Sequence, residues 1–480
     1  MHPNEPDVLA WPPVGDGSEA LFDSDLADDQ SADATLRDRW WWPAGFAEWF
    51  AISLTFLPAI LYLPNSQAYR LPARIGAYGI SVYAFTMWWF DRAGRKESHH
   101  PAERWLMMVG VLLFAMIAHP GTPSALSGVA HAVLYFAIFS PIYWVPAYVS
   151  SRRRLVRVLA IILLCNGLNS VVGILQVYDP DRWMPKQLSM VFQGEAGRDA
   201  LAASTYTGPN GRQIIRPPGL FDTPGAVCGA GSLAAVLGLI FCLEPIAWWK
   251  RAIALGLSGA GLAAIYLSHV RASFVVTLMM MVLYLALITS QRQAKRAAGF
   301  LGLGAALVVG SLSFAVMLGG DSVQERFMTL VGGDPRETYY NARGAQVEYA
   351  FTEMLDRYPL GAGLARWGMA AFYFGSDTAG IDHEVTFAEV QPNAWVLDGG
   401  WPLLILYSLA LMSTVAFDLR LIRALRDPTD RLLASIVVAT NFGTLFFVFT
   451  FVPFGTASGM QFWFLEGALH GAFAWRPRTE

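Results

Sequence analysis

Long apolar segments recur along this chain, and they restrict the folds that it can adopt. A helix that crosses a membrane needs about 20 mainly apolar residues, because lipid offers no partners for exposed backbone groups. The sequence contains about twelve candidate segments. Their approximate ranges are 44–63, 71–90, 104–118, 126–149, 155–178, 221–243, 249–268, 272–290, 297–319, 394–418, 431–452 and 456–475. The pattern predicts an all-α, polytopic membrane protein.

The composition of the chain agrees with this prediction. Of its 480 residues, 54% are hydrophobic and only 15% are charged, whereas a soluble domain carries about 25% charged residues. The net charge of -3 gives no reason to expect a nucleic-acid partner. The cysteines are odd in number and lack the spacing of metal ligands, so we expect neither a disulfide framework nor a cysteine metal site.

Basic residues predict the orientation, because Lys and Arg concentrate in cytoplasmic loops. They cluster in every second short loop, at Arg92, Arg95, Lys96 and Arg104; Arg152, Arg153, Arg154 and Arg157; Lys250 and Arg251; Arg292, Lys295 and Arg296; and Arg420, Arg423, Arg426 and Arg431. Both termini are then cytoplasmic, and we expect a bacterial inner-membrane protein. Residues 1–42 lack the basic start of a signal peptide and predict a disordered acidic tail, followed by a transmembrane domain over 43–475.

Two long polar segments face the outside in this topology, which is the periplasm of a Gram-negative cell. They span about 179–220 and 320–393. In the second, apolar residues recur at helical spacing, at Val347, Ala350, Phe351, Met354 and Leu355. We expect an amphipathic helix that begins after Asn341 and ends at Tyr358–Pro359, lying flat against the helix bundle or the lipid headgroups.

Arginines recur beside predicted helix starts and glycine turns on this outer side. Arg216 lies in IIRPPGLFDTPGAVCGAG, Arg271 in LSHVRASFVVTL and Arg343 in NARGAQVEY. Arginine makes bidentate contacts to phosphate and keeps its charge when partly buried. A single such residue is equally compatible with a lipid headgroup or an acidic partner. Three on one face favour an anion-binding site.

Taken in order, these segments resemble motifs of the O-antigen ligase and O-antigen polymerase family, which belong to the lipid-linked glycan ligase-polymerase superfamily. The resemblance covers about residues 216–410 and includes NARGAQVEYAFTEMLDRYPLGAGLARWG and QPNAWVLDGGWPLLILY. It implies a metal-independent glycosyltransferase without a cofactor. Such an enzyme moves a glycan from an undecaprenyl-pyrophosphate carrier to a hydroxyl of a lipid or glycan acceptor at the outer face. By this resemblance, Arg271 and Arg343, together with Arg216, bind the pyrophosphate.

One position departs from the family pattern and leaves the catalytic base open. Where the family usually has a histidine before an asparagine, this chain has Pro392 before Asn393, and proline cannot accept a proton. The nearest histidine is His383, in the same loop, and imidazole is suited to acid–base work. The alternative bases are Glu384, Glu389 and Asp398.

Two other functions remain compatible with the sequence. A transporter or flippase for a glycan or an anion usually shows internal repeats and charges near the middle of the membrane. The chain shows no clear repeat and few such charges. Glu466 and His470, four residues apart on one helix, favour a structural pair, and in a transporter they could instead line a proton path. A non-catalytic subunit for polysaccharide assembly would explain the missing histidine.

Overall fold

The computed structural model of the protein describes residues 45–63, 69–91, 99–186, 188–189, 192, 194–374 and 388–474. The acidic tail expected over 1–42, and also His383 and Glu384, lie outside these residues. The described chain is helical apart from loops and one small two-stranded sheet, which confirms the all-α class.

Six helical segments in the described residues are long and apolar enough to cross a membrane. They are α4 with α5 (Ala125–Phe139 and Pro141–Tyr148), α6 (Arg152–Tyr178), α11 (Arg271–Ser290), α12 (Ala294–Gly319), α18 (Gln391–Ala424) and α19 (Pro428–Phe447). The protein is therefore an all-α protein with several helices capable of spanning a membrane. The set of twelve spans stays a prediction.

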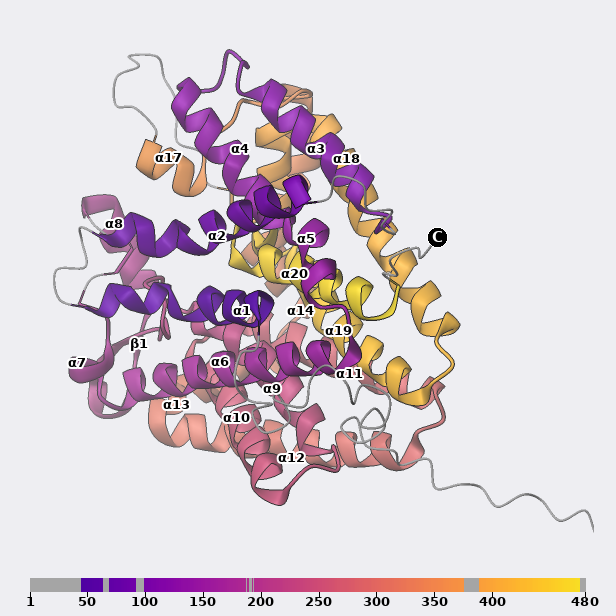
Figure 1. Ribbon diagram of the computed structural model, residues 1–480. Coiled ribbons are helices and arrows are strands. Elements are labelled where there is room, and N and C mark those ends of the chain that lie inside the picture. Colours follow the sequence, from indigo (N-terminus) through magenta and orange to yellow (C-terminus); the bar gives the residue numbers. More distant parts are fainter. Residues whose placement is uncertain are drawn as a thin grey trace, which may run out of the picture.

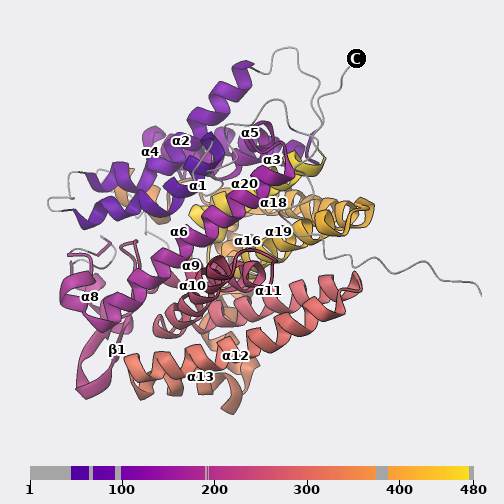
Figure 2. The same ribbon diagram turned by 60° about the horizontal axis from the view of Figure 1, so that its bottom comes forward.

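The other predicted apolar segments are also helical. They form α1 (Phe46–Phe56) with the 3-10 turn η2 (Pro58–Tyr62), α2 (Arg70–Asp91), α3 (Glu103–Met116), α9 (Val227–Cys242), α10 (Trp248–Leu267) and α20 (Ala457–Phe473). Helix α9 is apolar around most of its circumference and lies between α6 and α10 (Figures 1 and 2). Its contact with α10 is close, since a Cβ atom on Gly231 would lie 2.6 Å from the carbonyl oxygen of Gly261.

The first of the two long polar segments folds into short elements that position Arg216. It contains α7 (Pro180–Trp183), α8 (Gly194–Ala203) and an antiparallel hairpin of β1 (Thr205–Thr207) and β2 (Gln213–Ile215), joined by η5 (Pro209–Gly211). Arg216 follows β2 directly, and its backbone N–H donates to the carbonyl oxygen of Ser204 at 2.9 Å. The hairpin thereby fixes the arginine in front of the loop that leads to α9.

The second long polar segment contains α13 (Asp321–Gly332) and then a helix that is continuous from Pro335 to Arg357. This helix comprises α14 (Pro335–Tyr339), the π-helical turn η6 (Tyr340–Gly344), α15 (Ala345–Tyr349), a second π-helical turn η7 (Ala350–Met354) and α16 (Leu355–Arg357). The expected start after Asn341 is wrong, because Asp334 caps the helix and accepts from the N–H of Arg336 at 2.8 Å. The expected end is confirmed, and the stripe residues Ala350, Met354 and Leu355 are buried.

Glycines then join this segment to α18. Gly361 and Gly363 have φ of 98° and 108°, and Gly400 has φ of 57°, where α18 is kinked. These values favour glycine because they lie in the left-handed region. The N–H of Ala362 donates to the carbonyl oxygen of Leu397 at 2.7 Å. These turns tie the chain before α17 (Gly368–Phe374) to the first half of α18, and α17 itself packs against α4 (Figure 1).

Candidate functional site

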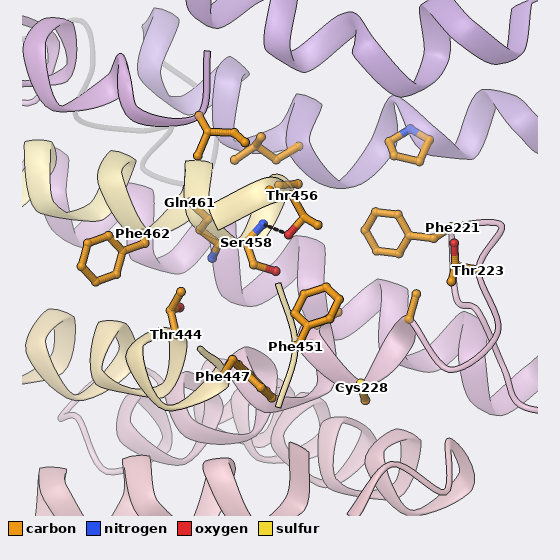
Figure 3. A pocket seen from close by; sticks show the side chains of 18 of the residues that line it. Phe221, Thr223, Cys228, Thr444, Phe447, Phe451, Thr456, Ser458, Gln461 and Phe462 are labelled. Atoms are coloured by element: carbon orange, nitrogen blue, oxygen red, sulfur yellow. Dashed lines mark hydrogen bonds between the residues drawn. The ribbon is translucent and has the colours of Figure 1, made fainter. Parts of the chain in front are cut away.

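A large pocket lies between the helices, with a volume of about 780 Å³. Its wall is mostly apolar and includes residues of α2, α4, α9, α19 and α20, together with the loop at 221–226. Figure 3 shows Phe221 and Thr223 on one side of the pocket and Thr444, Gln461 and Phe462 on the other. The pocket therefore offers a long apolar surface with polar groups at a few places, which is typical of a site for an amphiphilic ligand.

Three arginines from separate elements converge beside this pocket. Arg216 precedes α9, Arg271 is the first residue of α11, and Arg326 lies in α13. Each is partly buried, and their guanidinium groups interact electrostatically with one another. We call these three residues the arginine cluster. Two of them, Arg216 and Arg271, were predicted as site residues, and the structure brings them together.

The charges of the arginine cluster lack a carboxylate partner among the described residues. Arg271 instead donates to the hydroxyl of Thr329 at 2.7 Å. The Nε atoms of Arg216 and Arg326 are buried, and no described residue forms a hydrogen bond with them. Burial lowers the pKa of Arg216 and of Arg326, and repulsion within the cluster lowers both pKa values further. Uncompensated cations of this kind favour an anion.

His269 lies against the cluster as a neutral group. Its backbone is left-handed, with φ of 57°, and its ring stacks on Tyr206 of β1 with the ring centroids 3.8 Å apart. Burial, and then the charges of Arg216 and Arg326, lower the pKa of His269 to about 3. The ring therefore adds no positive charge near neutral pH, and the arginines supply the charge of the site.

The arginine cluster and the pocket share a wall. Val270 and Ala272, which flank Arg271 in the sequence, both line the pocket, and so does Gly225. The N–H of Gly225 donates to the carbonyl oxygen of Arg216 at 3.2 Å, and Gly225 adopts φ of 80°. An anion held by the cluster would thus lie beside an apolar chain held in the pocket.

Arg343, the third predicted arginine, lies in the pocket wall and has an acidic partner. It forms an ion pair with Glu389 and donates through Nε to the carbonyl oxygen of Thr450 at 3.2 Å. Gln346 donates to the same Glu389 carboxylate at 2.6 Å. Both members of the ion pair keep more than a third of their side chains exposed, 38% for Arg343 and 41% for Glu389. Because Glu389 is paired with Arg343, it is a poorer candidate for the catalytic base.

Asp398, one of the alternative bases, is fully buried in a network that the sequence does not reveal. Its carboxylate accepts from the hydroxyl of Tyr135 at 2.7 Å and from the indole Nε1 of Trp367 at 2.9 Å. Nε2 of His131 lies 3.1 Å from its Oδ1 atom, at ion-pair distance but off the line of a hydrogen bond. Tyr135, Trp367 and His131 all line the pocket.

Sequence reasoning missed three residues of this region. His131 lies within an apolar helix, where a histidine is usually taken for a core residue. A tryptophan such as Trp367 is usually taken for an anchor at the membrane interface. Arg326 stands in the polar stretch VQERFMTL, three residues before Thr329. That spacing puts the two on one helix face, but only the fold brings this face to Arg271.

Comparison with known proteins adds no family to this description. No protein-family model matches the chain, and no curated protein matches it.

Proposed function

We propose that this protein is a membrane glycosyltransferase of the O-antigen ligase or polymerase type. It would transfer a glycan from an undecaprenyl-pyrophosphate carrier to an acceptor hydroxyl at the outer face of the bacterial inner membrane. The observation that carries the proposal is the arginine cluster without carboxylate partners, next to a large apolar pocket.

The chemistry of the carrier matches these two features. A polyprenyl pyrophosphate combines a dense negative charge with a long apolar chain. Arg216, Arg271 and Arg326 provide donors for phosphate oxygens, and the pocket wall provides apolar surface. The charge on the leaving pyrophosphate grows in the transition state, so preorganised arginines lower the barrier. Arg343 is a further cation at the pocket wall, available if the ligand competes with Glu389.

The proposed topology has twelve spans with both termini in the cytoplasm. The regular alternation of basic loops supports it, and it puts the arginine cluster on the outer side. The acceptor oxygen forms a bond to the anomeric carbon, and the bond from that carbon to the pyrophosphate oxygen breaks. Ligase and polymerase differ only in the molecule that bears the acceptor hydroxyl.

Deletion of the gene in its native bacterium tests the proposal. We expect the surface glycan, separated on a gel, to be lost or shortened, and to return on complementation with the wild-type gene. Variants with Arg271→Ala or Arg326→Ala should fail to complement. The control is Arg336→Ala, an exposed arginine of α14. An unchanged glycan after deletion, or full rescue by both cluster variants, would refute the proposal.

A transporter or flippase for the same kind of glycan is the second candidate, and one observation favours it. The carboxyl groups of Asp418 in α18 and Glu466 in α20 contact each other in the interior. Asn441 donates to Glu466 at 2.6 Å. Buried acids in membrane helices often belong to ion pathways. Proteoliposomes separate the two functions, because a flippase moves the lipid-linked glycan without an acceptor, whereas a transferase releases undecaprenyl pyrophosphate only with one. A non-catalytic assembly subunit would do neither.

A further inference from the structure

We infer that His131 accepts the proton of the acceptor hydroxyl and that Asp398 is its positioning residue. The inference rests on the proposed function and adds to it the group that activates the acceptor. It comes from four side chains that the fold brings together from α4, α18 and the turn before α17. His131, Tyr135 and Trp367 line the pocket, and Asp398 is fully buried next to them.

His131 carries a ring nitrogen that lacks a hydrogen-bond partner among the described residues. Its ring lies in the pocket wall, and 5% of the residue is exposed. The Nδ1 atom is buried and has no hydrogen-bond partner among the described residues. A buried polar atom without a partner destabilises the fold and calls for a reason, such as a catalytic role. A hydroxyl entering the pocket would supply the missing partner.

Asp398 determines which nitrogen of His131 faces the ligand as an acceptor. Its charge lies 3.1 Å from Nε2 and favours the proton on that nitrogen, so that Nδ1 keeps its lone pair. After Nδ1 takes a second proton, the same carboxylate stabilises the imidazolium ion. Tyr135 and Trp367 donate to Asp398 and hold it in place.

The backbone around Asp398 keeps this geometry rigid. Asp398 stands two residues before the kink of α18 at Gly400, where the N–H of Trp401 donates to the carbonyl oxygen of Pro359 at 2.9 Å. Trp367 follows the same interlocked turn, and its ring lies edge-on to the His131 ring with centroids 5.6 Å apart. Preorganised groups of this kind suit acid–base catalysis.

The other charged groups of the pocket wall are already engaged. Asp222 accepts from Arg74 and also, at 2.9 Å, from Arg70, and Arg343 pairs with Glu389 outside the wall. Tyr135 and Asp398 are the titratable groups that contact or face His131 from α4 and α18. Among the described residues of the pocket wall, His131 therefore offers a ring nitrogen that no other side chain engages.

The proton balance of the step is simple. The acceptor oxygen bonds to the anomeric carbon as its proton moves to Nδ1 of His131. The bond from the anomeric carbon to the pyrophosphate oxygen breaks, and its electron pair leaves with the undecaprenyl pyrophosphate. The imidazolium ion then returns its proton to solvent or to the product phosphate.

The test uses the full-length protein in lipid nanodiscs with an undecaprenyl-pyrophosphate-linked oligosaccharide and its acceptor. General-base catalysis contributes about 10²–10⁴-fold to rate, so we expect His131→Ala to lower kcat by at least about 100-fold. The KM for the donor should change far less, because the arginines bind the pyrophosphate. Added imidazole should restore part of the rate to His131→Ala, and Asp398→Asn should lower kcat and alter its pH profile. His99→Ala is the control, since His99 is half exposed and does not line the pocket.

The outcomes separate this inference from the proposed function. Two outcomes would overturn only the role of His131. In the first, the wild type transfers the glycan and His131→Ala keeps full activity. In the second, His131→Ala melts like the wild type and loses rate, but imidazole does not restore that rate. No transfer by the wild type, with donor and acceptor both present, would overturn the proposed function and this inference with it. If His131→Ala fails to fold, His131→Gln serves in its place, and full activity of that variant refutes the inference.

Discussion

Replacing Arg326 by glutamine should improve the stability of the empty protein while weakening its binding of pyrophosphate. The reason is that Arg216, Arg271 and Arg326 repel one another, and burial already lowers the pKa of Arg216 and Arg326. Removing one of the three charges relieves this repulsion. Binding sites commonly trade stability for function in this way.

The two effects differ in size. Arg326 is half-buried, so solvent screens its repulsion, and we expect a gain in the free energy of unfolding of at most about 1 kcal/mol. A hydrogen bond to a charged group contributes about 1.5–3 kcal/mol. Loss of the Arg326 contact to a bound anion should therefore raise the Kd for pyrophosphate by about 10- to 150-fold.

Isothermal titration with inorganic pyrophosphate measures the affinity, and thermal melting in the same detergent measures the stability. Arg336→Gln is the matched control, because Arg336 is an exposed arginine of the same outer segment. Its melting temperature and affinity should both stay close to those of the wild type. A lower melting temperature for Arg326→Gln together with an unchanged Kd would mean that Arg326 is structural, and the cluster would lose its role as an anion site.

Three further perturbations test other parts of the structure. His269 stays neutral in the folded state because its pKa is lowered to about 3. In the unfolded chain the same side chain takes up a proton near its ordinary pKa of 6.5. The stability of the fold is therefore complete above about pH 6.5 and falls as the pH drops toward 3. His269→Asn, which tolerates left-handed backbone, should lose less melting temperature between neutral pH and about pH 5. Gly400→Ala should destabilise the protein by about 1–3 kcal/mol in denaturant unfolding, because the added Cβ would lie 2.2 Å from a backbone oxygen. The control is Gly256→Ala, which should leave the stability unchanged because its added Cβ would have no other atom within 4 Å. Glu389→Gln should free Arg343 and lower the Kd for pyrophosphate, whereas Arg343→Gln should not lower it; equal affinities in both variants would exclude Arg343 from the anion site.

Helix formation could be predicted from the sequence because it depends on local properties. The apolar segments are long and contain few polar side chains, so each must satisfy its backbone hydrogen bonds within itself. The end of the outer-loop helix at Arg357 was also predictable, since Pro359 disfavours helical geometry in the residue before it. Its start was misplaced because Asn341 and Asp334 are both good caps. In the structure the helix runs without interruption through two π-helical turns, so Asp334 is its N-cap.

The candidate site depended on contacts between distant parts of the chain. Arg216 and Arg271 could be selected from the sequence because arginines beside helix starts on one predicted face are recognisable. Arg326 could not, since its partner Arg271 lies 55 positions earlier. Arg343 was expected to bind the anion together with Arg216 and Arg271. It differs from them because it forms an ion pair with Glu389, which lies 46 residues later in the chain.

Local features of the sequence were enough for the all-α class and for the approximate positions of the long apolar helices, because hydropathy and capping act within a few residues. The tertiary structure decided which charges meet and which are compensated. Asp398 shows the difference most clearly: its partners Tyr135 and His131 come from a helix more than 260 residues earlier. Electrostatic and hydrogen-bond partners depend on distance in space, and only the packing of α4 near α18 brings this acid to the pocket.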